Sequence, residues 1–121
     1  MSPLHWAALL LVGGVGATVR FRVDRLITAR AGGSFPVGTL AVNISGAMIL
    51  GLLAAAALPP TLTLIAGTGL IGSYSTFSTW MLETSRLAEE RQSSSATVNL
   101  AASIVLGMLA VGCGQILAQH L

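Results

Sequence analysis

The sequence predicts an all-α membrane protein with a single domain of four transmembrane helices over residues 1–121. Of the 121 residues, 54% are hydrophobic and only 8% are charged, and the mean hydropathy is +0.83. The 52 consecutive positions 31–82 carry no charged residue, whereas one spanning helix needs about 20 apolar residues. Pro59 and Pro60 divide this stretch into two spans, because proline cannot continue a helix interior. The approximate spans are therefore 4–25, 36–58, 61–82 and 95–118.

The first span begins with the apolar run 4–19. A helix of that length rises about 24 Å, which is less than the roughly 30 Å of a hydrocarbon core. We therefore expect Arg20, the next residue, to lie at or inside the membrane boundary. Gly13, Gly14 and Gly16 are expected to let a neighbouring helix approach closely.

Polar residues recur at helical spacing in the second and fourth spans. Thr39, Asn43 and Gly46 share one face of the second span. In the fourth span Asn99 and Ser103 are four residues apart and Gly107 follows. Two interpretations stay open for these stripes: interhelical hydrogen bonds of about 0.6 to 2 kcal/mol each, or the lining of a path for a polar solute.

The third span carries six hydroxyl side chains within residues 73–79. Interhelical bonding needs only one or two polar groups per helix, and these six cover every face of two turns. Short hydroxyl residues compete for backbone hydrogen bonds and weaken a helix. We therefore predict a helix interrupted near residues 72–79. Interrupted membrane helices present carbonyl groups to cations and N–H groups to anions, so the break alone does not name the ion.

The basic residues predict how the chain is oriented. All six are arginines, and they fall in the first and third connections, whereas the second, around Pro59, has none. The positive-inside rule therefore places the first and third connections in the cytoplasm and both termini outside. No basic stripe interleaved with aromatic residues is present, so a nucleic-acid ligand is not expected.

Several short motifs follow one another along the chain in a fixed order: Gly13-Gly14, Gly16-Ala17, Arg20-Phe21, Gly38-Thr39-Leu40, Val42-Asn43, Gly46, Gly69-Leu70-Ile71-Gly72, Ser75-Thr76-Phe77-Ser78-Thr79-Trp80 and Glu83. Through these motifs, and over nearly its whole length, the chain resembles the small bacterial fluoride channels called Fluc or CrcB. The resemblance implies a fluoride-selective channel, not an enzyme, that passively exports cytoplasmic fluoride. It also implies a multi-pass protein of the bacterial inner (plasma) membrane, in which two four-helix subunits form an antiparallel dimer with two pores in the lipid bilayer.

The resemblance also implies roles for individual residues. Asn43 corresponds to an amide that donates to fluoride, and Phe77 corresponds to the first of two pore phenylalanines. Arg20 corresponds to an arginine at the pore entrance, although it equally suits a snorkelling anchor. One structural sodium ion, not transported, is expected on the backbone carbonyl groups of Gly72 and Ser75. The full expected fluoride pathway is Asn43, Phe77, Trp80, Ser103, Asn99, Thr39, Thr76, Thr79 and Arg20.

Trp80 departs from the family pattern because it stands where the second pore phenylalanine is expected. Three roles stay open for its indole: donating to fluoride, narrowing the pore, or marking a subunit with one altered pore. The distribution of arginines is a second departure, since a homodimer of antiparallel subunits favours balanced charge on the two sides. The partner is therefore either a second copy or an oppositely oriented homologue.

Two other classes of membrane protein are alternatives to a channel. A small multidrug-resistance-type transporter needs a carboxylate in its first span, and residues 4–19 have none. A purely structural membrane subunit leaves the hydroxyls of the third span unexplained. An enzyme is not expected, because no embedded histidine or carboxylate stands near Ser75 to activate it.

Overall fold

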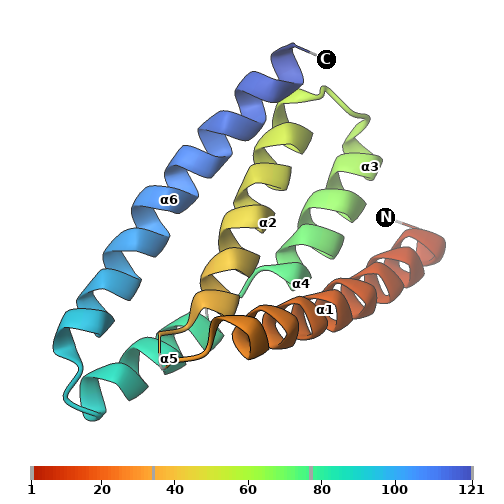
Figure 1. The fold of residues 1–121 in the computed structure, drawn as a ribbon. Helices are drawn as coiled ribbons and strands as arrows, with labels where there is room; N and C mark the ends of the chain where they lie inside the picture. The colour runs from red at the N-terminus through yellow and green to blue at the C-terminus, as the bar shows by residue number, and fades with distance from the viewer. Residues whose placement is uncertain (1, 34, 77, 121) are drawn as a thin grey trace.

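A computed structural model shows the chain as a bundle of helices (Figure 1). It describes residues 2–33, 35–76 and 78–120, and of residues 78 and 79 only the backbone. Within these residues every regular element is helical, which confirms the predicted all-α class. The elements are α1 (Pro3–Ala31), α2 (Val37–Ala55), α3 (Pro60–Thr63), the π-helix η1 (Leu64–Ile71), α4 (Gly72–Tyr74), α5 (Ser78–Glu89) and α6 (Ser93–Gln119).

Three of the described helices, α1, α2 and α6, are long and apolar enough to cross a membrane. The chain is therefore a membrane protein, as predicted. The third predicted span is divided: α3, η1 and α4 follow one another without a gap over residues 60–74, and α5 starts a separate helix. Figure 1 shows this segment running back beside α2 from the end at which the C terminus lies. The count of four spanning helices stays a prediction.

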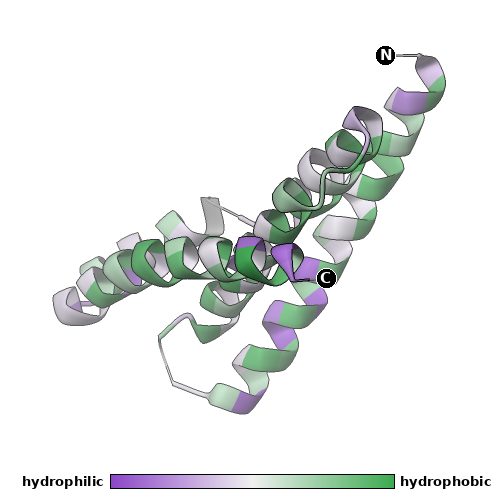
Figure 2. Cartoon of the chain, turned by 90° about the horizontal axis from the view of Figure 1, so that it is seen from above, coloured by the Kyte–Doolittle hydropathy of each residue, from purple (hydrophilic) through white to green (hydrophobic). Residues whose placement is uncertain are grey.

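Helix α1 continues beyond the boundary expected at residue 25. It ends at Ala31, where Gly32 and Gly33 adopt positive φ angles of 65° and 74° that other residues rarely adopt. Its 29 residues span about 43 Å, more than the roughly 30 Å of a hydrocarbon core. Figure 2 shows polar residues concentrated in the half of α1 that lies away from the N terminus.

Two glycines bring α2 and α6 into backbone contact. A Cβ atom on Gly114 would lie 2.1 Å from the carbonyl oxygen of Met48, and one on Gly51 would lie 2.3 Å from that of Val111. Real side chains do not approach this closely, so both positions require glycine. Close backbone approach of this kind is a major source of helix association in membranes.

Helix α1 packs against the broken helix through Gly16. A Cβ atom there would lie 2.4 Å from the carbonyl oxygen of Leu70 and 2.2 Å from Oγ of Ser73. The predicted close approach is thus confirmed at Gly16. It is not found at Gly14, where a Cβ atom would meet no described atom within 4 Å.

Candidate functional site

The third span is interrupted where the hydroxyl run predicts. Helix α4 ends at Tyr74, and Ser75 is extended with φ −73° and ψ 156°. Thr76 is also non-helical, and α5 begins at Ser78. The predicted interruption is confirmed. Phe77 and the side chain of Thr79 lie outside the described residues. Their predicted roles in the fluoride pathway therefore stay predictions.

Asn43 holds the backbone of the break with two hydrogen bonds. Its Nδ2 donates to the carbonyl oxygen of Thr76 at 3.0 Å, and its Oδ1 accepts from the N–H of Thr76 at 2.9 Å. A backbone group without a partner inside a membrane costs several kcal/mol, so this amide stabilises the break. Because Nδ2 carries two N–H donors, the bond to Thr76 leaves the second one for another acceptor.

The hydrogen bond between Thr76 and Asn43 also affects the carbonyl groups that are expected to bind sodium. In a continuous helix the N–H of Thr76 would donate to the carbonyl oxygen of Gly72, but here it donates to Asn43. The N–H and Oγ of Ser75 both donate to the carbonyl oxygen of Ile71, at 2.9 and 3.0 Å. The carbonyl group of Ile71 thus keeps its regular helical bond, whereas that of Gly72 loses the bond from Thr76, and an oxygen ligand of this kind suits a hard cation. The chemistry of the Gly72 carbonyl group is therefore compatible with a sodium ion.

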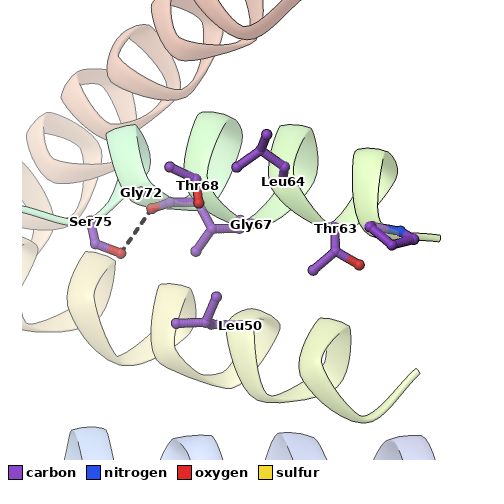
Figure 3. A pocket seen from close by; sticks show the side chains of 9 residues that line it. Leu50, Thr63, Leu64, Gly67, Thr68, Gly72 and Ser75 are labelled. Atoms are coloured by element: carbon purple, nitrogen blue, oxygen red, sulfur yellow. Dashed lines mark hydrogen bonds between the residues drawn. The ribbon is translucent and has the colours of Figure 1, made fainter. Parts of the chain in front are cut away.

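Gly72 and Ser75 line an open groove of about 750 Å³ between α2 and the broken helix (Figure 3). Figure 3 shows Leu50 on one wall and Thr68 and Leu64 on the other. The full lining is Leu50, Pro60, Thr63, Leu64, Gly67, Thr68, Ile71, Gly72 and Ser75.

An adjoining groove of about 380 Å³ brings together residues predicted for both ions. It is lined by uncharged residues from α2, from the broken helix and from the start of α5. Three of them, Asn43, Thr76 and Trp80, were predicted for fluoride, and Gly72 and Ser75 were predicted for sodium. The complete lining is Asn43, Gly46, Ala47, Leu50, Gly72, Ser75, Thr76 and Trp80.

Thr39 lies on α2 one turn before Asn43 and is only 2% exposed. Its hydroxyl donates to Oε1 of Glu83, a half-buried carboxylate on α5. Neither residue lines the grooves described above. Glu83 contributes to the family resemblance, but its pairing with Thr39 was not predicted. The sequence carries no signal for a contact between residues 44 positions apart.

Asn99 and Ser103 lie on α6, and Asn99 is 1% exposed. Asn99 Nδ2 donates to Oγ1 of Thr84 at 2.7 Å, and Trp80 Nε1 donates to the Asn99 carbonyl oxygen at 3.3 Å. Within the described residues, Oδ1 of Asn99 and Oγ of Ser103 are buried without a hydrogen-bond partner. No role was predicted for Thr84 from the sequence, although it lies four residues after Trp80 and so on the same helix face.

Comparison with known proteins decides the family of the chain. The family model described as "CrcB-like protein, Camphor Resistance (CrcB)" matches residues 7–115. The chain belongs to the CrcB family. It is 54% identical over 114 residues to "Fluoride-specific ion channel FluC 2" of Mycobacterium tuberculosis, a match that covers 94% of this chain and 90% of the relative. It is 42% identical over 118 residues to "Fluoride-specific ion channel FluC 1" of Leifsonia xyli subsp. xyli, covering 94% and 86%.

The match to the CrcB family model includes both grooves and the Thr84–Asn99 contact. It also includes Arg20, which is half-buried on α1 and lines neither groove. The resemblance noted from the sequence is therefore confirmed at the level of the family. The roles of the individual residues stay predictions.

Proposed function

We propose that this chain forms a fluoride-selective ion channel that exports cytoplasmic fluoride passively. The observation that carries the proposal is the groove beside the broken helix, where Asn43, Thr76 and Trp80 lie together. The two relatives named above, which match most of the chain, carry the name of a fluoride-specific ion channel.

The chemistry of this groove suits a small anion that binds weakly enough to be released again during conduction. The second N–H of Asn43 and the positive edge of an aromatic ring attract an anion through partial charges. None of the described residues that line the groove is charged, and a full positive charge there would bind the anion too tightly for conduction. The driving force is the membrane potential, which is worth about 2.3 kcal/mol per charge for each 100 mV.

The functional unit is an antiparallel dimer of two four-helix subunits in the bacterial inner (plasma) membrane, with two pores. The open grooves support this assembly, because Gly72 and Thr68 are exposed on the single chain. The carbonyl groups of Gly72 and Ser75 would hold a structural sodium ion, whose positive charge would tie the two subunits together. Arg20 would attract anions towards the pore entrance.

The partner is either a second copy or an oppositely oriented homologue. Four of the six arginines lie in the second half of α1, Arg86 lies in α5 and Arg91 lies between α5 and α6, and not all in the connections as expected from the sequence. Figure 1 places α5 and the C-terminal end of α1 at the end of the molecule away from the C terminus. Such a bias favours one orientation for every copy. A homodimer then requires half of the copies to insert against the bias.

Fluoride efflux from liposomes that contain only this purified chain tests both the channel function and whether a second copy can serve as the partner. We expect efflux, recorded with a fluoride electrode, well above that of protein-free vesicles, and no matching efflux from chloride-loaded vesicles. Efflux from the chain alone would reject an obligate heterodimer. If the folded chain is silent both alone and with an oppositely oriented homologue, or conducts chloride equally, the proposed function is wrong.

A further inference from the structure

We propose that Thr84 and Asn99 form a hydrogen-bonded latch that positions Trp80. In this latch the indole N–H of Trp80 bonds to the backbone of Asn99 and does not face the groove. The latch consists of Trp80, Thr84 and Asn99. Trp80 therefore presents its ring, and not its N–H, to the groove. The importance of this ring for transport rests on the proposed channel function, whereas the latch itself rests on contacts alone.

Three hydrogen bonds close the latch into a ring. Thr84 Oγ1 donates to the backbone carbonyl oxygen of Trp80 at 2.9 Å, one turn earlier in α5. Asn99 Nδ2, on α6, donates to the same Oγ1 at 2.7 Å. Trp80 Nε1 returns to α6 by donating to the Asn99 carbonyl oxygen at 3.3 Å. The side chain and the backbone of one asparagine thus hold both ends of the α5 turn.

The proton count supports this assignment of donors. A threonine hydroxyl has one proton, and in Thr84 it is directed to the Trp80 carbonyl group. Its oxygen must therefore accept from Asn99, which places Nδ2, and not Oδ1, next to Thr84. Thr84 is 7% exposed and Asn99 is 1% exposed. Loss of one partner from so buried a pair leaves a polar group unsatisfied.

The latch rules out one of the three roles that the sequence leaves open for Trp80. Indole has a single N–H donor and no acceptor, and here that donor is used by Asn99. The half-buried ring lines the groove with Asn43 and Thr76. The chemistry left to it is that of an aromatic ring, whose positive edge attracts an anion. The indole N–H is then not the fluoride donor.

The same contacts give Asn99 a positioning role in place of its predicted role as a ligand in the fluoride pathway. Its Oδ1 is buried without a partner among the described residues. A carbonyl oxygen accepts hydrogen bonds and therefore repels a fluoride ion.

Thr84→Val tests the latch, with Thr84→Ser as the matched control that keeps the hydroxyl. Both variants are made in a Trp6→Phe background, in which Trp80 is the only tryptophan. We expect T84V to raise acrylamide quenching of Trp80 fluorescence. It should also slow fluoride efflux about tenfold, a change of about 1.4 kcal/mol in the barrier. T84S should match the parent in both measurements, and unchanged quenching in a folded T84V protein would overturn the latch.

Trp80→Phe tests the role of the ring and does not depend on how T84V folds. This variant keeps an aromatic ring but loses the Nε1 bond to Asn99, so we expect it to slow efflux by no more than about tenfold. Trp80→Leu, without a ring, should lose most of it. A folded W80F protein that loses efflux as completely as W80L would show that the indole N–H does more than hold the ring against α6, and would overturn the assignment. If the parent itself does not conduct, the channel proposal fails, and fluorescence still decides the latch.

Discussion

Replacement of Gly114 by alanine is expected to weaken the contact between α2 and α6. The new Cβ atom would lie 2.1 Å from the carbonyl oxygen of Met48 and 2.8 Å from the backbone nitrogen of Leu52. Ordinary contact begins at 3.4 Å, so the helices must separate by about 1.3 Å (3.4 minus 2.1). Both clashing atoms belong to the backbone and cannot rotate away.

The matched control is Gly112→Ala, two residues earlier in α6, where a Cβ atom meets nothing within 4 Å. Alanine favours a helix over glycine by about 0.8 to 1.0 kcal/mol at both positions. Only G114A adds overpacking, which costs about 1 to 3 kcal/mol. Because two backbone atoms clash, we expect G114A to be less stable than G112A by about 3 kcal/mol, near the upper end of that range.

Reversible unfolding in mixed micelles of increasing SDS content measures this difference, with helix content followed by circular dichroism. Gel filtration of each variant before unfolding shows whether the starting state is the same. Equal free energies of unfolding for G114A and G112A would refute the inferred backbone contact.

Three further predictions concern the candidate site. Asn43→Asp should abolish fluoride efflux, because it sets a carboxylate oxygen against the Thr76 carbonyl group and adds negative charge to the path. The control Ser45→Ala, outside the groove, should conduct normally, and efflux from N43D would remove Asn43 from the pathway. Thr39→Val should lower the free energy of unfolding by about 1.5 to 3 kcal/mol, the range for a hydrogen bond to a charged group, whereas Thr39→Ser should keep most of it; equal stability of T39V and the parent would contradict the contact. Replacing sodium by N-methylglucamine should reduce efflux and the dimer fraction on gel filtration, both restored by sodium, and indifference to sodium would count against the proposed cation at the break.

The membrane spans and the break could be predicted because both depend on local sequence. Every backbone group in a membrane needs a partner inside the protein, and a helix supplies these partners within one segment, so a long apolar run predicts a helix. The hydroxyl run at 73–79 predicts the interruption, since such side chains compete with helical bonding nearby. The π-helix η1 was not predicted, because the run 64–71 differs from an ordinary apolar helix in no local pattern.

The polar contacts could be predicted only in part. Helical spacing places Thr39 and Asn43 on one face and says nothing of what that face meets. Asn43 reaches Thr76 across 33 positions, and Thr39 reaches Glu83 across 44. The role of Thr84 depends on the packing of α5 beside α6, which the sequence alone does not show.

The sequence by itself determined that this protein is a helical membrane protein of the CrcB type with a broken third span. Those properties follow from composition, from spacing within single segments and from the motifs that carry the family resemblance. Only the tertiary structure decided what each polar group bonds to: the amide of Asn43 to the break, and the indole of Trp80 to α6. The physical reason is that hydrogen bonds act over about 3 Å, and helix packing alone brings residues so distant in sequence to that separation.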